Sequence, residues 1–308
     1  MKAFYCDHFV LPLPAGHRFP MAKYSMLRNR VVGEGVVCLD DLHVPYAVTD
    51  EDLVRVHTAG YVDAVVSGSL TMSEQRRIGF PWSPGLVERS RRSVGGTVAA
   101  CLQALDVGVS ANLAGGTHHA FADAGEGFCV FNDSAVAARF LQARGLVDRI
   151  LILDCDVHQG NGTAAIFNGD SSVTTFSMHG ANNYPFRKQG SDVDVPLRDG
   201  TGDREYLDAL ERHLATVLTP SRYDLAVYVS GADPFVGDRL GRLSLSKEGL
   251  ASRDRIVFDA LRDEGIPVAV VMAGGYASDV VDTVDIHLAT LRAARESHDK
   301  PTSAVRTP

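Results

Sequence analysis

Apolar and polar positions along the chain form a regular succession of strand-like and helix-like segments. Short, largely apolar runs predict buried strands, because a strand covered on both faces has no polar side. Such runs occupy residues 2–6, Ala111–Leu113, Ile150–Leu153, Val173–Ser177, Leu225–Val229 and Pro267–Met272. Between them, apolar residues recur at helical spacing. The predicted helices are Asp50–Ser67 (two short helices around Val56-His57-Thr58), Val87–Leu105, Asp133–Arg144, Asp203–Leu218 and Ser246–Arg262.

This alternation is typical of an α/β fold with a mostly parallel central sheet and helices on both faces. A chain of 308 residues can form one large domain or two small ones. Because it contains no internal repeat, low-complexity linker or change of composition, we expect a single domain over residues 1–296. Residues 297–308 are predicted to be a polar, disordered tail. Asp133–Arg144 has the clearest amphipathic pattern, and Pro220 is expected to end the helix Asp203–Leu218.

Composition and charge exclude several classes of function. The chain is 45% hydrophobic and 22% charged, and its net charge of −8 argues against binding to nucleic acid. No apolar run is long enough to cross a bilayer and the N-terminus does not resemble a signal peptide, so no membrane association is expected. Five cysteines without Cys-x-x-Cys spacing are typical of reduced thiols, and we expect a cytoplasmic protein.

Four predicted strands end in unusual polar residues. These residues are His118, His119, Asp154, Asp156, His158, Asp233 and Tyr276. The carboxyl ends of parallel strands lie at one edge of a sheet, so we expect the side chains to converge. Asp156 and His158 are two residues apart and would point the same way if the strand geometry continues. The alternative is a chance Asp-x-His pair before an ordinary glycine turn.

Asp156, His158 and Asp233 could together supply three metal ligands and leave a position open for water, as in catalytic zinc sites. The set is rich in oxygen, so Fe(II) or Co(II) is also compatible. Of the adjacent His118 and His119, one could act as a base while the other stays charged. The alternative for the two histidines is a loop pair with structural hydrogen bonds. The alternative for Tyr276, which follows Gly274-Gly275, is a residue beside a tight turn rather than a hydroxyl donor.

Five ordered motifs resemble those of histone deacetylase-like amidohydrolases. The motifs are Gly115-Gly-Thr-His-His119, Gly127-Phe-Cys-Val-Phe-Asn-Asp133, Asp154-x-Asp-x-His-Gln-Gly-Asn-Gly162, Gly231-Ala-Asp233 and Gly274-Gly-Tyr276. The resemblance covers about residues 16–276, and the segment Gly231–Ser246 is most similar to the class IV (histone deacetylase 11-like) branch and its bacterial relatives. It implies the arginase/deacetylase fold and hydrolysis of an N-acyl amide.

The resemblance also implies a role for each site residue. Asp156, His158 and Asp233 would hold Zn²⁺. His119 would act as general base and then general acid, His118 would assist electrostatically, and Tyr276 would donate to the oxyanion. Asp154 would orient His118 and, with Ser177 and the main-chain oxygens of Asp156, His158 and Met178, hold a structural K⁺. Phe128 and Tyr184, with Gly127 beside them, would form the walls of an acyl-lysine tunnel.

One position departs from the class I pattern, in which an aspartate orients the second histidine. This chain has Asn161 there, as the class IV branch does. A neutral amide stabilises an imidazolium less than a carboxylate does, so we expect His119 to be neutral at physiological pH. Replacing Asn161 by aspartate should then move the acid limb of the pH–rate profile.

The expected substrate is acetyl-lysine or a longer acyl-lysine in a protein or peptide, with acetylpolyamines and small acylated metabolites as alternatives. The acidic net charge favours cationic substrates, although it does not give the charge at the tunnel mouth. Loops Leu13–Tyr24, Ile78–Pro84 and Gly180–Gln189 are expected to shape that mouth. His17, Arg18 and Lys23 in the first loop are either solvated charges or substrate contacts. The sequence indicates no oligomeric state.

Two alternatives are an enzyme of the same fold class and, from another class, a protein without catalytic activity. A binuclear manganese ureohydrolase would need additional bridging carboxylates. An inactive acyl-lysine binding module would not need all three ligands, both histidines and the tyrosine. We therefore expect a metal-dependent deacylase.

Overall fold

The computed structural model describes residues 1–14, 16–219 and 223–300. Its centre is an eight-stranded sheet in which all neighbouring strands are parallel, in the order β2-β1-β3-β8-β7-β4-β5-β6. The strands are β1 Ala3–Phe4, β2 Leu42–His43, β3 Val109–Asn112, β4 Ile150–Asp154, β5 Val173–Gly180, β6 Val193–Leu197, β7 Leu225–Val229 and β8 Val268–Val271. The predicted α/β fold is confirmed.

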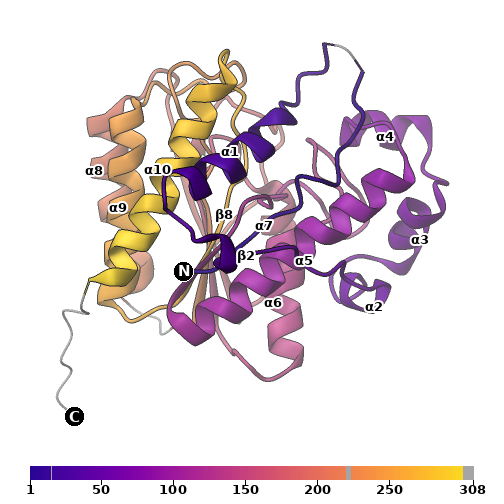
Figure 1. The fold of residues 1–308 in the computed structure, drawn as a ribbon, viewed down its shortest axis with the longest axis horizontal. Helices are drawn as coiled ribbons and strands as arrows, with labels where there is room; N and C mark the ends of the chain where they lie inside the picture. Colours follow the sequence, from indigo (N-terminus) through magenta and orange to yellow (C-terminus); the bar gives the residue numbers. More distant parts are fainter. Residues whose placement is uncertain (15, 220–222, 301–308) are drawn as a thin grey trace.

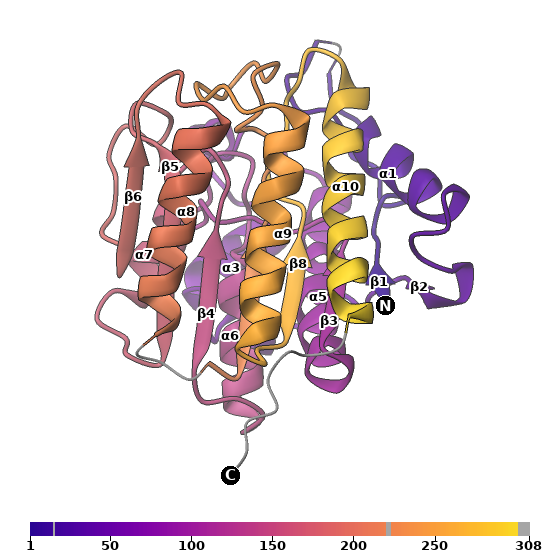
Figure 2. The same cartoon turned by 90° about the vertical axis from the view of Figure 1, so that its left-hand side faces the viewer.

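Helices cover both faces of the sheet (Figures 1 and 2). The helices on one face are α1 Ala22–Gly33, α8 Asp203–Leu218, α9 Lys247–Asp263 and α10 Val280–Asp299. Those on the other side are α2 Asp50–Leu53, α3 Ala59–Ser67, α4 Met72–Ile78, α5 Pro84–Val107, α6 Asp133–Ala143 and α7 Asn161–Phe167, and a 3₁₀ helix spans Leu39–Asp41. None of the helices in the described ranges combines the length and apolar content needed to span a bilayer.

The central strands contribute alternate side chains to two hydrophobic cores. In β4, Leu151 and Leu153 pack with the α8–α10 face, whereas Ile150 and Ile152 pack with the α5–α6 face. All five β4 residues are buried. Because both faces are covered, the strand is apolar throughout rather than alternating, which explains why short apolar runs marked the strands.

Most predicted elements are present, and one prediction about them is wrong. The helix at Asp133–Ala143 is not amphipathic, because it packs beside α5, with α2 and α7 next to it, and most of its residues are buried. Helix α10 includes residues 297–299, which we had assigned to the tail. Pro220 and residues 301–308 lie outside the described residues.

Two sequence features of the α4–α5 region have structural explanations. A Cβ on Gly95 would lie 1.9 Å from the carbonyl oxygen of Tyr46, so this glycine lets α5 pack directly against the preceding loop. Trp82 donates from Nε1 to Val65 O at 2.7 Å, and its ring covers Gly68. Trp82 is therefore a packed loop residue.

The strand order brings the polar strand ends together. Strands β3, β8, β7 and β4 are consecutive in the sheet, and their carboxyl ends carry the four polar segments singled out above. Helix α10 begins four residues after Tyr276 at this edge, and its end at His298 lies beside Gly108, at the amino end of β3. The helix therefore runs from the edge with the polar residues to the opposite edge.

Candidate active site

A metal-ligand cluster of Asp156, His158 and Asp233 lies where β4 and β7 end. One potential ligand atom from each residue falls within 4.8 Å of the others, and all three residues are buried. His158 Nδ1 lies 3.0 Å from Asp156 Oδ1 and 3.2 Å from Asp233 Oδ2. The structure therefore brings together the three ligands predicted from the sequence.

Backbone groups fix both carboxylates of this cluster. Gly274 N–H donates to Asp156 Oδ2 at 2.8 Å, and Val157 N–H donates to Asp233 Oδ1 at 2.9 Å. The other oxygen, Asp233 Oδ2, is buried and faces His158 Nδ1 at 3.2 Å, without the geometry of a hydrogen bond. A buried carboxylate oxygen with its partner oxygen already bonded is suited to a cation.

Two glycines leave space for these carboxylates. A Cβ on Gly231 would lie 2.5 Å from Asp156 Oδ2, and one on Gly274 would lie 1.9 Å from Asp233 Oδ2. Any larger residue at either position would displace a ligand, which gives a steric reason for the glycines in the Gly-Ala-Asp and Gly-Gly-Tyr segments.

The charges of the cluster also fit a divalent cation. Burial and the nearby Asp156 raise the pKa of Asp233 to about 7. Burial alone would lower the pKa of His158, but Asp156 and Asp233 outweigh it and raise that pKa to about 10. Two buried carboxylates and one imidazole are a donor set that Zn²⁺ or a similar ion accepts, and its charge would relieve their repulsion.

The two adjacent histidines have different partners and opposite pKa shifts. His118 Nδ1 lies 2.6 Å from Asp154 Oδ2, and His119 Nδ1 lies 2.7 Å from Asn161 Oδ1. Burial lowers the pKa of His118, but the carboxylates of Asp154 and Asp156 outweigh it and raise the pKa to about 9. Burial and the neighbouring imidazoles lower the pKa of His119 well below its usual value. The two adjacent rings therefore differ in basicity, and His118 takes up a proton more readily than His119.

Glu126 is a site residue that sequence reasoning missed. Asn161 Nδ2 donates to Glu126 Oε1 at 2.7 Å, so the amide joins this carboxylate to His119. Tyr184 also forms a side-chain hydrogen bond to Glu126, which together with burial raises the tyrosine pKa. Only the position of Glu126 next to Gly127 in the motif could have drawn attention to it.

Aromatic side chains surround the approach to the histidines. The Tyr184 ring lies 5.0 Å from the His119 ring, and the Phe128 ring lies 6.0 Å from that of Tyr276. Phe128 has a left-handed backbone with φ of 66°. A Cβ on Gly127 would lie 2.6 Å from His119 Cδ2, so glycine is needed there. The residues predicted to form a tunnel therefore do line one cavity.

Tyr276 closes this approach on the β8 side. Its ring centroid lies 6.5 Å from that of His158, and its N–H donates to Asp238 Oδ2 at 2.6 Å. Burial and the carboxylates of Asp233 and Asp156 raise the pKa of the phenol well above its ordinary value. The hydroxyl therefore stays protonated and available as a donor.

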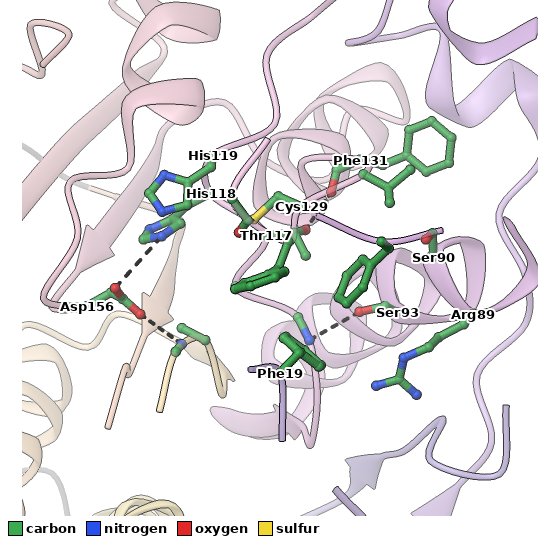
Figure 3. A pocket seen from close by; sticks show the side chains of 18 of the residues that line it. Phe19, Arg89, Ser90, Ser93, Thr117, His118, His119, Cys129, Phe131 and Asp156 are labelled. Atoms are coloured by element: carbon green, nitrogen blue, oxygen red, sulfur yellow. Dashed lines mark hydrogen bonds and ion pairs between the residues drawn. The ribbon is translucent and has the colours of Figure 1, made fainter. Parts of the chain in front are cut away.

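A narrow cavity of about 80 Å³ continues behind the histidines. Figure 3 shows Asp156 joined to His118 on one side of it, with Arg89 on the other. Lys23 lies near this cavity rather than in a solvated loop. Its Nζ donates to Ala273 O at 3.0 Å and faces the Tyr276 ring at 5.5 Å, and burial lowers its pKa to about 8. The alternative of a solvated loop charge is wrong for Lys23, because its side chain is buried at the start of α1, whereas substrate contact stays a prediction.

The predicted potassium ligands lie on β5, at the end of β4 and in the segment after it. Asp154 and Ser177 are register partners of β4 and β5, and both are buried, as is Met178. Asp154 Oδ1 accepts from Asp156 N–H at 3.0 Å, and Ser177 Oγ lies 3.0 Å from His179 Nδ1. Potassium binding stays a prediction.

Comparison with known proteins gives consistent matches. Residues 17–291 match the histone deacetylase domain family. An uncharacterized protein of Picosynechococcus sp. is 46% identical over 95% of this chain and 97% of its own length. A histone deacetylase-like amidohydrolase of Pseudomonas aeruginosa is 32% identical over 88% of this chain and 75% of its length. A crystal structure of an HDAC homolog complexed with SAHA is 25% identical with a TM-score of 0.82, covering 94% of this chain and 83% of that one.

Proposed function

Because the chain belongs to the histone deacetylase family, we propose that it is a zinc-dependent hydrolase that removes an acyl group from the side-chain amide of lysine. One observation carries the proposal: the Asp156–His158–Asp233 cluster, the His118–His119 pair and Tyr276 converge at one sheet edge. The sequence features of the segment 231–246 support a place in the class IV branch.

Asp156, His158 and Asp233 would hold the zinc ion, which when bound polarises the amide carbonyl and lowers the pKa of a bound water. His119 Nε2 accepts the proton of the attacking water, since its Nδ1 is directed to Asn161 Oδ1. The same nitrogen then returns the proton to the leaving amine.

His118 and Tyr276 stabilise the charge that develops during the reaction. The imidazolium of His118, paired with Asp154, provides a fixed positive charge next to His119, whose ring centroid is 4.1 Å away. The Tyr276 hydroxyl donates a hydrogen bond to the oxyanion. Phe128 and Tyr184 would contact the methylene groups of the lysine and exclude water from the amide.

Further details belong to the same proposal. Within the described residues, one His/Asp cluster has metal-ligand geometry, which favours a one-metal hydrolase over a binuclear ureohydrolase. A structural potassium ion would use the Asp154 and Ser177 side chains with main-chain oxygens nearby. The five cysteines are free thiols, four of them buried, which supports a reducing cytoplasm as the location.

The test uses zinc-reconstituted protein and two fluorogenic lysine amides, one acetylated and one carrying a long acyl chain. We expect about one zinc per chain, turnover of at least one amide, and a loss of roughly 100-fold or more in kcat in Tyr276→Phe, as when an oxyanion donor is removed. Wild-type protein that binds zinc but hydrolyses neither amide would contradict the lysine deacylase.

A further inference from the structure

The tunnel mouth is positively charged although the whole chain carries a net charge of −8. Two grooves meet there and share Arg18, Gly127, Phe128 and Tyr184. The first, which we term the α4 groove, adds Arg76 and Arg77 from the end of α4. The second, which we term the β7 groove, adds Arg239 and Arg242 from the loop after β7. Among the described residues lining either groove there is no aspartate or glutamate.

Hydrogen bonds to main-chain oxygens hold these arginines close to the reacting centre. Gly127 N–H donates to Arg77 O at 3.1 Å, which ties the end of α4 to the tunnel wall. On the other side, Arg239 Nε donates to Tyr276 O at 3.0 Å. The α4 groove therefore lies next to Gly127, which is assigned to the tunnel wall, and the β7 groove lies next to Tyr276, which is assigned to catalysis.

Most of these guanidinium groups have no carboxylate partner. Within the described ranges, Arg18 and Arg77 form no ion pair, and Arg76 donates only to the Met72 carbonyl. Glu74, the acidic residue of α4, instead caps its own helix through Thr71. Arg242 alone is paired, with the exposed Asp199 at 3.3 Å.

Several arginines elsewhere on the surface are paired instead. Arg28 pairs with Asp7, Arg92 with Glu88 and Arg139 with Asp170. Unpaired guanidinium groups facing one opening create a positive field there and retain donors for carboxylates. Such a mouth repels a polycation, so it opposes an acetylpolyamine substrate.

We propose that the substrate is an acyl-lysine within an acidic peptide segment, with carboxylates on both sides of the modified lysine. This inference rests on the proposed function. Apart from the four shared residues, the two grooves are formed by different segments of the chain. Their volumes are about 450 Å³ for the α4 groove and 490 Å³ for the β7 groove, so an extended chain can occupy both grooves at once. Phe186, 84% exposed in the β7 groove, adds an apolar surface for a peptide side chain. A small anionic acyl-amine would use one groove only.

The first experiment compares peptides with the same central acyl-lysine. Flanking residues are glutamate, glutamine or lysine on both sides, and two further peptides carry glutamate on one side only. We expect kcat/KM to be about tenfold higher for the two-sided glutamate peptide than for the lysine peptide, with one-sided peptides in between. The difference should shrink at 1 M salt. Equal rates for the one-sided and two-sided glutamate peptides would favour a small anionic amide and overturn the peptide proposal.

The second experiment changes the grooves. Arg77→Glu should remove the preference for only one of the one-sided peptides, because Arg77 lines the α4 groove alone, and Arg18→Glu should reduce both preferences. Arg255→Glu makes the same charge change at an exposed position of α9. We expect it to keep the wild-type ratio of kcat/KM between the glutamate and lysine peptides. Unchanged ratios in Arg77→Glu and Arg18→Glu would overturn the inference. If wild-type enzyme with bound zinc hydrolyses no peptide, the proposed function fails instead.

Discussion

At the residue scale, Asn161 shows how one side-chain amide can join two functional groups. Its Oδ1 faces His119 and its Nδ2 donates to Glu126. Since an amide has an acceptor at one end and donors at the other, Glu126 favours the orientation that keeps the proton on His119 Nδ1. The free lone pair of Nε2 can then face the substrate.

Asn161→Asp should therefore impair the enzyme, because the new carboxylate would lie against Glu126. We expect kcat to fall about tenfold or more, and the acid limb of the pH–rate profile to move to higher pH, since a carboxylate raises the pKa of His119. Adding Glu126→Gln should recover much of kcat, because its amide can donate to the new carboxylate. Steady-state kinetics of both single variants and the double variant measure this coupling.

A double variant no faster than Asn161→Asp would show that Glu126 does not act through position 161. Glu126→Gln alone is the matched control and should have a small effect, since its amide oxygen still accepts from Asn161. A purely structural role of Glu126 toward Tyr184 would produce no such recovery.

The sequence identified the residues that belong to ordered motifs and missed those whose role depends on a distant partner. Asp156, His158 and Asp233 were predicted because spacing and strand ends bring them together. Lys23 was assigned to a loop because its acceptor, Ala273 O, is 250 positions away in the chain. Glu126 was missed for a similar reason, since its partner Asn161 is 35 positions away.

At the scale of elements, the sequence predicted best the segments with a clear hydrophobic pattern, either a continuous apolar run or a helical periodicity. The bounds of α8 and β7 were predicted as observed, whereas β2, β6, α4, α7 and α10 were not predicted. Strand β2 has only two residues, and β6 is an edge strand with Pro196 and exposed positions. Helix α7 starts inside the Gly160–Gly162 segment, where glycines indicate a turn.

His57, between α2 and α3, should make stability depend on pH. Its Nδ1 lies 3.0 Å from Phe121 O and its Nε2 accepts from Asn132 N–H, and burial lowers its pKa to about 4. Between pH 6.5 and 4 the unfolded chain binds a proton that the folded chain does not, so stability is lost as pH falls. This loss amounts to about 2 kcal/mol from pH 7 to 5.

Urea unfolding of wild type and His57→Gln at pH 7 and pH 5 measures this contribution. The variant should lose about 2 kcal/mol less than the wild type over that interval. Equal losses in both proteins would mean that other histidines carry the pH dependence.

Arg253 on α9 supports both loops of the candidate metal-binding cluster. It is fully buried, and its Nη1 donates to Gly231 O at 2.7 Å and Cys155 O at 3.3 Å while Nη2 pairs with Asp254 at 2.8 Å. Arg253→Met would leave the Asp254 carboxylate buried without its cation. We expect the free energy of unfolding to fall by about 3–5 kcal/mol in urea titrations.

The exposed Arg255→Met on the same helix is the control and should change stability by about 0.5 kcal/mol at most. A similar small effect of Arg253→Met would show that the ion pair contributes little to stability.

At the scale of the whole molecule, the resemblance to histone deacetylases is confirmed, and the sheet is more regular than expected because every strand pairing is parallel. Motif order predicted the family, since motifs depend on local sequence. Charge at the mouth was not predictable in this way. The net charge of −8 averages over the surface, whereas the arginines of the two grooves come from α4 and from loops far apart in the chain.

Removing the metal should destabilise the whole domain, since a ligand bound only by the folded state contributes about 4 kcal/mol at a thousandfold excess over Kd. We expect chelation to lower Tm by roughly 5–10 °C, and added zinc to restore it. Thermal unfolding followed by circular dichroism measures this shift. Asp233→Asn should respond less to chelator and zinc, and an equal response would indicate that zinc binds elsewhere.

The path of α10 also determines how the molecule can be attached to a solid support. The helix starts beside Tyr276 and its end near Asp299 lies at the amino ends of β3 and β8. A tether placed next to Asp299 would hold the molecule by the edge farthest from the tunnel mouth. On a biosensor chip, both arginine grooves would then face the flowing peptide solution.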